Sequence, residues 1–186
     1  MSDFVSLPRR IFLDSSTLQT LDTYGAFIWD GYEIESNDQI WHIPDGIENL
    51  EALRNIFIVQ NRADFEFALS KNSFIEVSAK GDAGYLQWAY DVLDHWQASL
   101  ESYDGDPFSG EGIALASKVD SPAFGYLGRG DRGLIRDAVL LECDAFLTME
   151  RRLPKNAGHI RQALGIRILT PIQYWDLLRP WARLYV

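Results

Sequence analysis

The fold of this chain is decided by residues 131–150, which run DRGLIRDAVLLECDAFLTME. Apolar side chains recur at helical spacing through the first half, and Ala145 to Thr148 then form a short run too brief for a helix. We therefore predict a helix over 131–142 that leads directly into a buried strand over 145–148. A helix that alternates with a buried strand is typical of a parallel α/β sheet.

The same alternation extends in both directions along the chain. Buried strands are predicted at 10–13, 65–69 and 166–169. Helices are predicted at 18–28, 47–61, from a capping box at 73, at 86–100, at 156–164 and from 171 onward. We predict one α/β domain over residues 1–186, with insertions at about 30–45 and 104–128.

The single cysteine, the N-terminal residues and the hydropathy of the chain predict where in the cell the protein is found. The only cysteine, Cys143, cannot form an intramolecular disulfide, and no zinc-binding spacing is present. The N-terminus lacks a basic and apolar export signal, and no window is apolar enough to span a membrane. We therefore expect a soluble, cytoplasmic protein without a membrane partner.

The charge of the chain is unevenly distributed. The formal net charge is −10, which by itself argues against nucleic-acid partners. Residues 1–128 hold 21 acidic and 7 basic residues, whereas residues 129–186 hold 6 acidic and 10 basic residues. The halves therefore carry −14 and +4, and the total charge is a poor guide to partners.

Four acidic residues are predicted to meet at one edge of the sheet. Asp14 and Glu150 follow strands, Glu76 lies in the first turn of the helix after the second strand, and Asp131 begins the helix before the 145–148 strand. In a parallel sheet all these positions lie at the carboxyl edge, where ligands bind. Four carboxylates so close together favour a hard divalent cation, Mg²⁺ or Mn²⁺.

Each acid also has a purely structural interpretation. Asp14 fits a helix N-cap, Glu76 fits the partner of Ser73 in a capping box, and Asp131 fits a cap after a glycine. Glu150 fits an exposed turn charge. Asp137 is a second choice for the place of Asp131, because on the helix it lies farther from the apolar stripe. Their joint placement at one edge favours the cation site.

Several segments resemble the PIN-domain nucleases, whose best-known bacterial members are the VapC-type toxin ribonucleases. The matching segments are 11–18, 73–77, 131–150 and 165–171. The resemblance implies a three-layer sandwich whose central sheet has about five parallel strands, with helices on both faces. The two predicted insertions are not accounted for by it.

The resemblance also implies a function. Asp14, Glu76, Asp131 and Glu150 would form the acidic quartet that holds one or two Mg²⁺ or Mn²⁺ ions and hydrolyses RNA phosphodiester bonds. Glu150 departs from the family pattern, which usually has the shorter Asp, and this puts the second metal position in question more than the first.

Residues beside the acids are candidates for binding the RNA substrate. Hydroxyl groups and arginines can contact phosphate oxygens, and the candidates are Ser15, Thr148, Arg129, Arg132, Arg151 and Arg152. The rival interpretation is a catalytically silent PIN-like module that binds RNA or a protein. The acidic N-terminal part suggests an antitoxin-like or other basic protein partner, and a homodimer is a further assembly to consider.

Overall fold

The structure is a computed structural model, and it describes residues 4–60, 65–70, 72–73 and 110–184. Its centre is a sheet in the order β2-β1-β3-β4, in which every neighbouring pair is parallel. The strands are β1 (Arg10–Leu13), β2 (Glu66–Ala68), β3 (Ala145–Leu147) and β4 (Arg167–Leu169). All four lie where the sequence predicts them, with ends that differ by at most one residue. The described residues thus give four strands, rather than the expected five or so.

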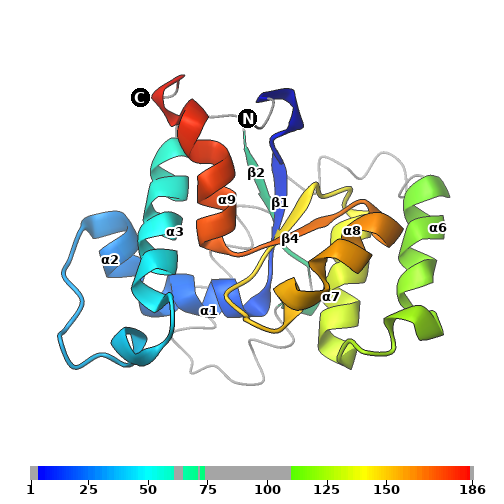
Figure 1. The fold of residues 1–186 in the computed structure, drawn as a ribbon, viewed down its shortest axis with the longest axis horizontal. Coiled ribbons are helices and arrows are strands. Elements are labelled where there is room, and N and C mark those ends of the chain that lie inside the picture. The colour runs from blue at the N-terminus through cyan, green and yellow to red at the C-terminus, as the bar shows by residue number, and fades with distance from the viewer. Residues whose placement is uncertain (1–3, 61–64, 71, 74–109, 185–186) are drawn as a thin grey trace.

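Helices cover both faces of the sheet (Figure 1). One face carries α1 (Ser15–Thr23), α2 (Gly25–Asp30), α3 (Gly46–Gln60) and α9 (Pro171–Leu178). The other face carries α6 (Gly110–Val119), α7 (Arg129–Leu140) and α8 (Ala157–Leu164). Short 3-10 helices complete the described part: η1 (Phe4–Ser6), η2 (Gln39–His42), η3 (Pro122–Phe124), η4 (Leu153–Asn156) and η5 (Arg179–Leu184).

Alternating side chains of the strands build one core on each face. Ile11 and Leu13 of β1 are fully buried among residues of α1, α3 and α9. Phe12, between them in sequence, points to the other face and stacks on Phe146 of β3 at a ring-centroid distance of 5.3 Å. Because successive strand residues point to opposite faces, a run of buried residues requires helices on both sides. The three-layer arrangement follows.

The predicted helix over 18–28 is in fact two helices, α1 and α2, which are separated at Tyr24. The Tyr24 hydroxyl donates to Asp38 Oδ1 at 2.7 Å. A Cβ at Gly25 would lie 2.7 Å from Cζ3 of Trp29, so a larger residue there would displace that half-exposed ring. Glycine is a poor helix former, and here it marks the break.

The segment predicted as an insertion at 104–128 is a structural element of the core from residue 110 onward. Helix α6 packs against α7 and buries Ala116 and Val119, and the turn after it buries Phe124 and Leu127. The 30–45 segment differs, since Ile40 of η2 is its one buried side chain. Within the described ranges, no helix is both long and apolar enough to cross a membrane.

Candidate functional site

The carboxyl ends of β1 and β3 lie side by side. Leu13 pairs with Leu147 in the parallel register, and the Asp14 N–H donates to the Leu147 carbonyl at 3.2 Å. Asp14 and Thr148, the next residue on each chain segment, are therefore neighbours at the carboxyl edge. This is the edge at which open α/β sheets bind ligands.

The carboxylate of Asp14 accepts hydrogen bonds on both oxygens. Oδ1 accepts from the Thr17 N–H at 2.7 Å and from the Ser16 hydroxyl at 2.9 Å. Oδ2 accepts from the Thr148 hydroxyl at 2.5 Å and from Ser16 Oγ at 2.9 Å. Asp14 is the N-cap of α1, so its capping interpretation is confirmed. Capping engages Oδ1, while Oδ2 faces the exit of β3.

Ser16 and Thr148 connect this carboxylate to the chain that leaves β3. Ser16 Oγ accepts from the Met149 N–H, and Thr148 Oγ1 accepts from the Glu150 N–H, each at 3.0 Å. Both hydroxyls therefore have an N–H donor and a carboxylate acceptor. We call Asp14, Ser16 and Thr148 the Asp14 junction.

The Asp14 junction is buried and contains no positive side chain. Asp14 is 4% exposed and Thr148 is 0% exposed. Among the described residues, hydroxyls and one backbone N–H make up the hydrogen-bond partners of this carboxylate. Burial raises the pKa of Asp14 above its ordinary value of 3.8, and the bonds from Thr148, Thr17 and Ser16 offset part of that rise.

Asp131 lies in the first turn of α7, at the same edge of the sheet. Gly128 is the N-cap of α7 and offers no capping side chain, so Asp131 is not itself the cap. A Cβ at Gly128 would lie 3.4 Å from Asp131 Oδ2, which places this carboxylate against the start of the helix. An acidic group there is favoured by the helix dipole. Asp131 is half-buried.

Asp137, the second choice, binds a different part of the chain. Its Oδ2 accepts from Asn72 Nδ2 at 2.7 Å, which ties α7 to the residues that follow β2. Asp144 lies at the opposite edge, where its Oδ2 accepts from the N–H groups of Arg9 and Arg10 at 2.9 and 3.0 Å.

Of the two remaining predicted acids, the structure describes Glu150 and does not describe Glu76. The side chain of Glu150 is exposed, although its N–H bonds to Thr148. Glu76 lies outside the described residues. Within the described part of the chain, no three His, Cys, Asp or Glu side chains form a group that could hold a metal ion.

The predicted substrate-binding residues differ in their exposure to solvent. Arg129, Arg151 and Arg152 are exposed, whereas Arg132 and Ser15 are half-buried. Thr148 is fully buried behind Asp14, so its hydroxyl positions that carboxylate. Ser16, which was not among the predicted residues, contacts the Asp14 carboxylate. The signal for Ser16 was its place two residues after an N-cap Asp, where a hydroxyl can reach back to the carboxylate.

The fold and the Asp14 junction define the class: a parallel α/β protein with a buried carboxyl at the carboxyl edge of its sheet. Comparisons with protein-family models, with curated proteins and with solved structures found no match for this chain.

Proposed function

We propose that this protein is a PIN-like, metal-dependent endoribonuclease in which Asp14 is the principal metal-binding residue. The observation that carries the proposal is the environment of Asp14. A carboxylate buried to 4% exposure, fixed by two hydroxyls and without a basic partner in the described chain, is destabilised in its ionised form. A divalent cation would supply the missing positive charge.

The donor chemistry fits Mg²⁺ or Mn²⁺, because the candidate ligands are oxygen atoms. Asp14 and Asp131 would hold the ion together with Glu76, which enters the proposal on sequence grounds. When bound, such an ion lowers the pKa of water and offsets charge on phosphate oxygens. Glu150 would complete a second position or orient the attacking water.

The other residues of the proposed site orient the Asp14 carboxylate or attract the RNA backbone. Ser16 and Thr148 fix the direction of the Asp14 carboxylate, which is how outer residues commonly orient metal ligands. The exposed side chains of Arg129, Arg151 and Arg152 would contact the RNA backbone, together with Arg132. Such contacts make binding weaken as salt increases.

The catalytically silent module remains the second candidate, and one observation favours it. Asp14 already caps α1 and accepts four hydrogen-bond contacts, and its raised pKa suits a neutral structural carboxyl. In that case the fold would serve to bind RNA or a protein, without hydrolysis. Metal-dependent activity separates the two candidates.

The test is cleavage of single-stranded RNA by the purified full chain, with Mn²⁺ and with EDTA. We expect Mn²⁺-dependent cleavage that Asp14→Asn and Asp131→Asn each reduce to the level of the EDTA control. Asp30→Asn is the matched control, because Asp30 is an exposed residue at the end of α2. It should cleave at the wild-type rate.

Three further outcomes are informative. Asp137→Asn should retain cleavage activity. If Asp137→Asn abolished cleavage and Asp131→Asn did not, Asp137 would take the metal-binding place assigned to Asp131. Unchanged cleavage in both Asp14→Asn and Asp131→Asn would contradict the assignment of these residues to the active site. Absence of cleavage by the wild-type chain would favour the silent module.

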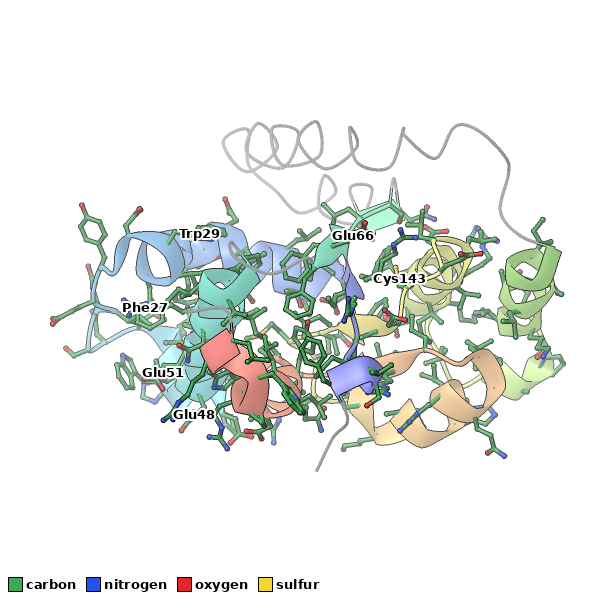
Figure 2. All side chains as sticks on the ribbon, turned by 90° about the horizontal axis from the view of Figure 1, so that it is seen from above. Phe27, Trp29, Glu48, Glu51, Glu66 and Cys143 are labelled. Atoms are coloured by element: carbon green, nitrogen blue, oxygen red, sulfur yellow. The ribbon has the colours of Figure 1, made fainter. Side chains whose placement is uncertain are left out.

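We also propose a basic protein segment as the partner of the acidic N-terminal part. Residues 11–53 contain nine acidic residues and neither Lys nor Arg. Phe27 and Trp29 of α2 lie at the same end of the molecule as Glu48 and Glu51 of α3 (Figure 2). A depression of about 340 Å³ is lined there by residues 40–45, 47 and 48.

This acidic aromatic surface, which we define as Trp41, Ile43 and Glu48, lines the depression and combines two features that suit a basic partner. Trp41 and Ile43 are 50% and 49% exposed, which is high for large apolar groups. Arginine binds both carboxylates and the faces of tryptophan rings.

A further inference from the structure

A second aromatic feature lies on the surface of the basic half of the chain. Tyr126 follows η3, and His159 lies in the first turn of α8. The Tyr126 hydroxyl and His159 Nδ1 lie 2.8 Å apart in a hydrogen bond, with the hydroxyl donating when Nδ1 carries no proton. Their ring centroids are 5.7 Å apart, in an edge-to-face arrangement.

Phe124 supports this pair from beneath. Its ring is 1% exposed, and its centroid lies 5.0 Å from that of His159 and 6.2 Å from that of Tyr126. The two surface rings are therefore held in place by packing as well as by their hydrogen bond. Tyr126 is nevertheless 46% exposed, so much of a fixed aromatic ring is presented to solvent.

The pair lies at the same edge of the molecule as the proposed active site. Tyr126 is three residues before the start of α7, whose first turn holds Asp131. Helix α8 leads into β4, so its first turn, with His159, is at the carboxyl edge of the sheet. Figure 1 shows α7 and α8 on the same face of the sheet.

The sequence segments that carry the pair are basic. Residues 151–161 contain Arg151, Arg152, Lys155 and Arg161 and no acidic residue, and residues 121–130 contain Arg129 and no acidic residue. All five of these basic side chains are exposed. Burial raises the pKa of the Tyr126 phenol, so the ring stays neutral at physiological pH and does not repel phosphate.

We propose that Tyr126 and His159 form a stacking site for a base of single-stranded RNA, next to the proposed active site. The inference rests on the proposed function, because it concerns the substrate of that site. Fixed, half-exposed aromatic rings among basic side chains are the usual means of binding single strands, whose unpaired bases stack on the rings. Bases within a duplex are not free to do so.

The test is fluorescence anisotropy of a labelled, unstructured 12-nucleotide RNA with the full chain in EDTA, which prevents hydrolysis. Tyr126→Ala should weaken binding about tenfold, the loss expected when one base no longer stacks on an aromatic ring. Tyr126→Phe keeps the ring and should stay close to wild type. Tyr32→Ala is the matched control, since Tyr32 is 68% exposed in the acidic half of the chain, and it should bind as wild type does.

Thermal unfolding of each variant shows whether it is folded. Three results would overturn the inference: unchanged affinity in folded Tyr126→Ala, an equal loss in Tyr126→Phe, or an equal loss with a blunt duplex of the same sequence. Failure of the wild-type chain to bind RNA would overturn it as well. The proposed function is judged separately, by whether Mn²⁺-dependent cleavage requires Asp14, so the two failures can be distinguished.

Discussion

Asp14 combines a capping role with an unusual electrostatic position. An N-cap carboxylate is ordinarily at the surface, where water stabilises its charge. Here the group is buried, and Ser16 and Thr148 hold its second oxygen toward the exit of β3. This arrangement fixes the direction of a carboxylate more firmly than capping requires, which suits a group that binds a ligand.

The raised pKa of Asp14 predicts a specific pH dependence of stability. Because the native state binds this proton more tightly than the unfolded chain, the contribution is fully present below the ordinary pKa of 3.8. It is lost as the pH rises through the native-state pKa. Asp14→Asn has a similar shape but no ionisation, so its free energy of unfolding should gain on that of the wild type as pH increases.

Urea unfolding in EDTA between pH 3 and pH 8 measures this difference. Other titrating groups are common to both proteins and cancel. A difference that is constant with pH, or that moves in favour of the wild type as pH rises, would contradict the assigned effect of burial.

The sequence was sufficient to place Asp14 but not to describe its surroundings. Its position follows from the short apolar run of β1, which ends one residue earlier. The bond from Thr148 depends on the pairing of β1 with β3, 134 residues away in sequence. Contacts across that separation are a property of the sheet order, which local patterns do not determine.

At the scale of elements, α6 is the helix that the sequence patterns did not assign. Residues 104–128 are predicted as an insertion without a helix assigned to them, and apolar residues at helical spacing within 110–119 form a packed helix. Packing against α7 provides the stability that local propensity lacks. The break at Tyr24 coincides with Gly25, a poor helix former that begins α2.

Helix α6 should therefore contribute to the free energy of unfolding through its buried face. Val119 is 0% exposed, and Val119→Ala should cost about 2 kcal/mol through lost burial and the resulting cavity. Ile113 on the same helix is 51% exposed, and Ile113→Ala should cost less than about 0.5 kcal/mol. Urea unfolding measures both, and equal small effects would show that α6 is an appendage.

At the scale of the whole molecule, the charge division has a structural counterpart. The acidic residues 11–53 include α1, α2 and the first half of α3, which lie on one face of the sheet, whereas α7 and α8 of the basic part lie on the other (Figure 1). The alternation of strands and helices predicted this parallel α/β layout. It could not predict which helices share a face, because that depends on the order of strands.

The acidic aromatic surface should bind a basic peptide. A 12-residue peptide that alternates Arg and Leu should change the tryptophan fluorescence of the full chain saturably, and Trp41→Ala should weaken its binding about fivefold through the lost cation–π contact. Glu142→Gln removes one exposed acid outside this surface and serves as the charge control. Equal peptide affinity of Trp41→Ala and wild type would show that Trp41 does not contribute, and that the peptide binds through general attraction between opposite charges.

The central claim is that Asp14 binds a divalent cation, and titration calorimetry with Mn²⁺ at pH 7.5 tests it most directly. The wild-type chain should bind at least one ion, and Asp14→Asn should bind it roughly tenfold more weakly or not at all. Asp30→Asn should match the wild type. Equal Mn²⁺ affinity in wild type and Asp14→Asn, or no binding by the wild type, would contradict the claim.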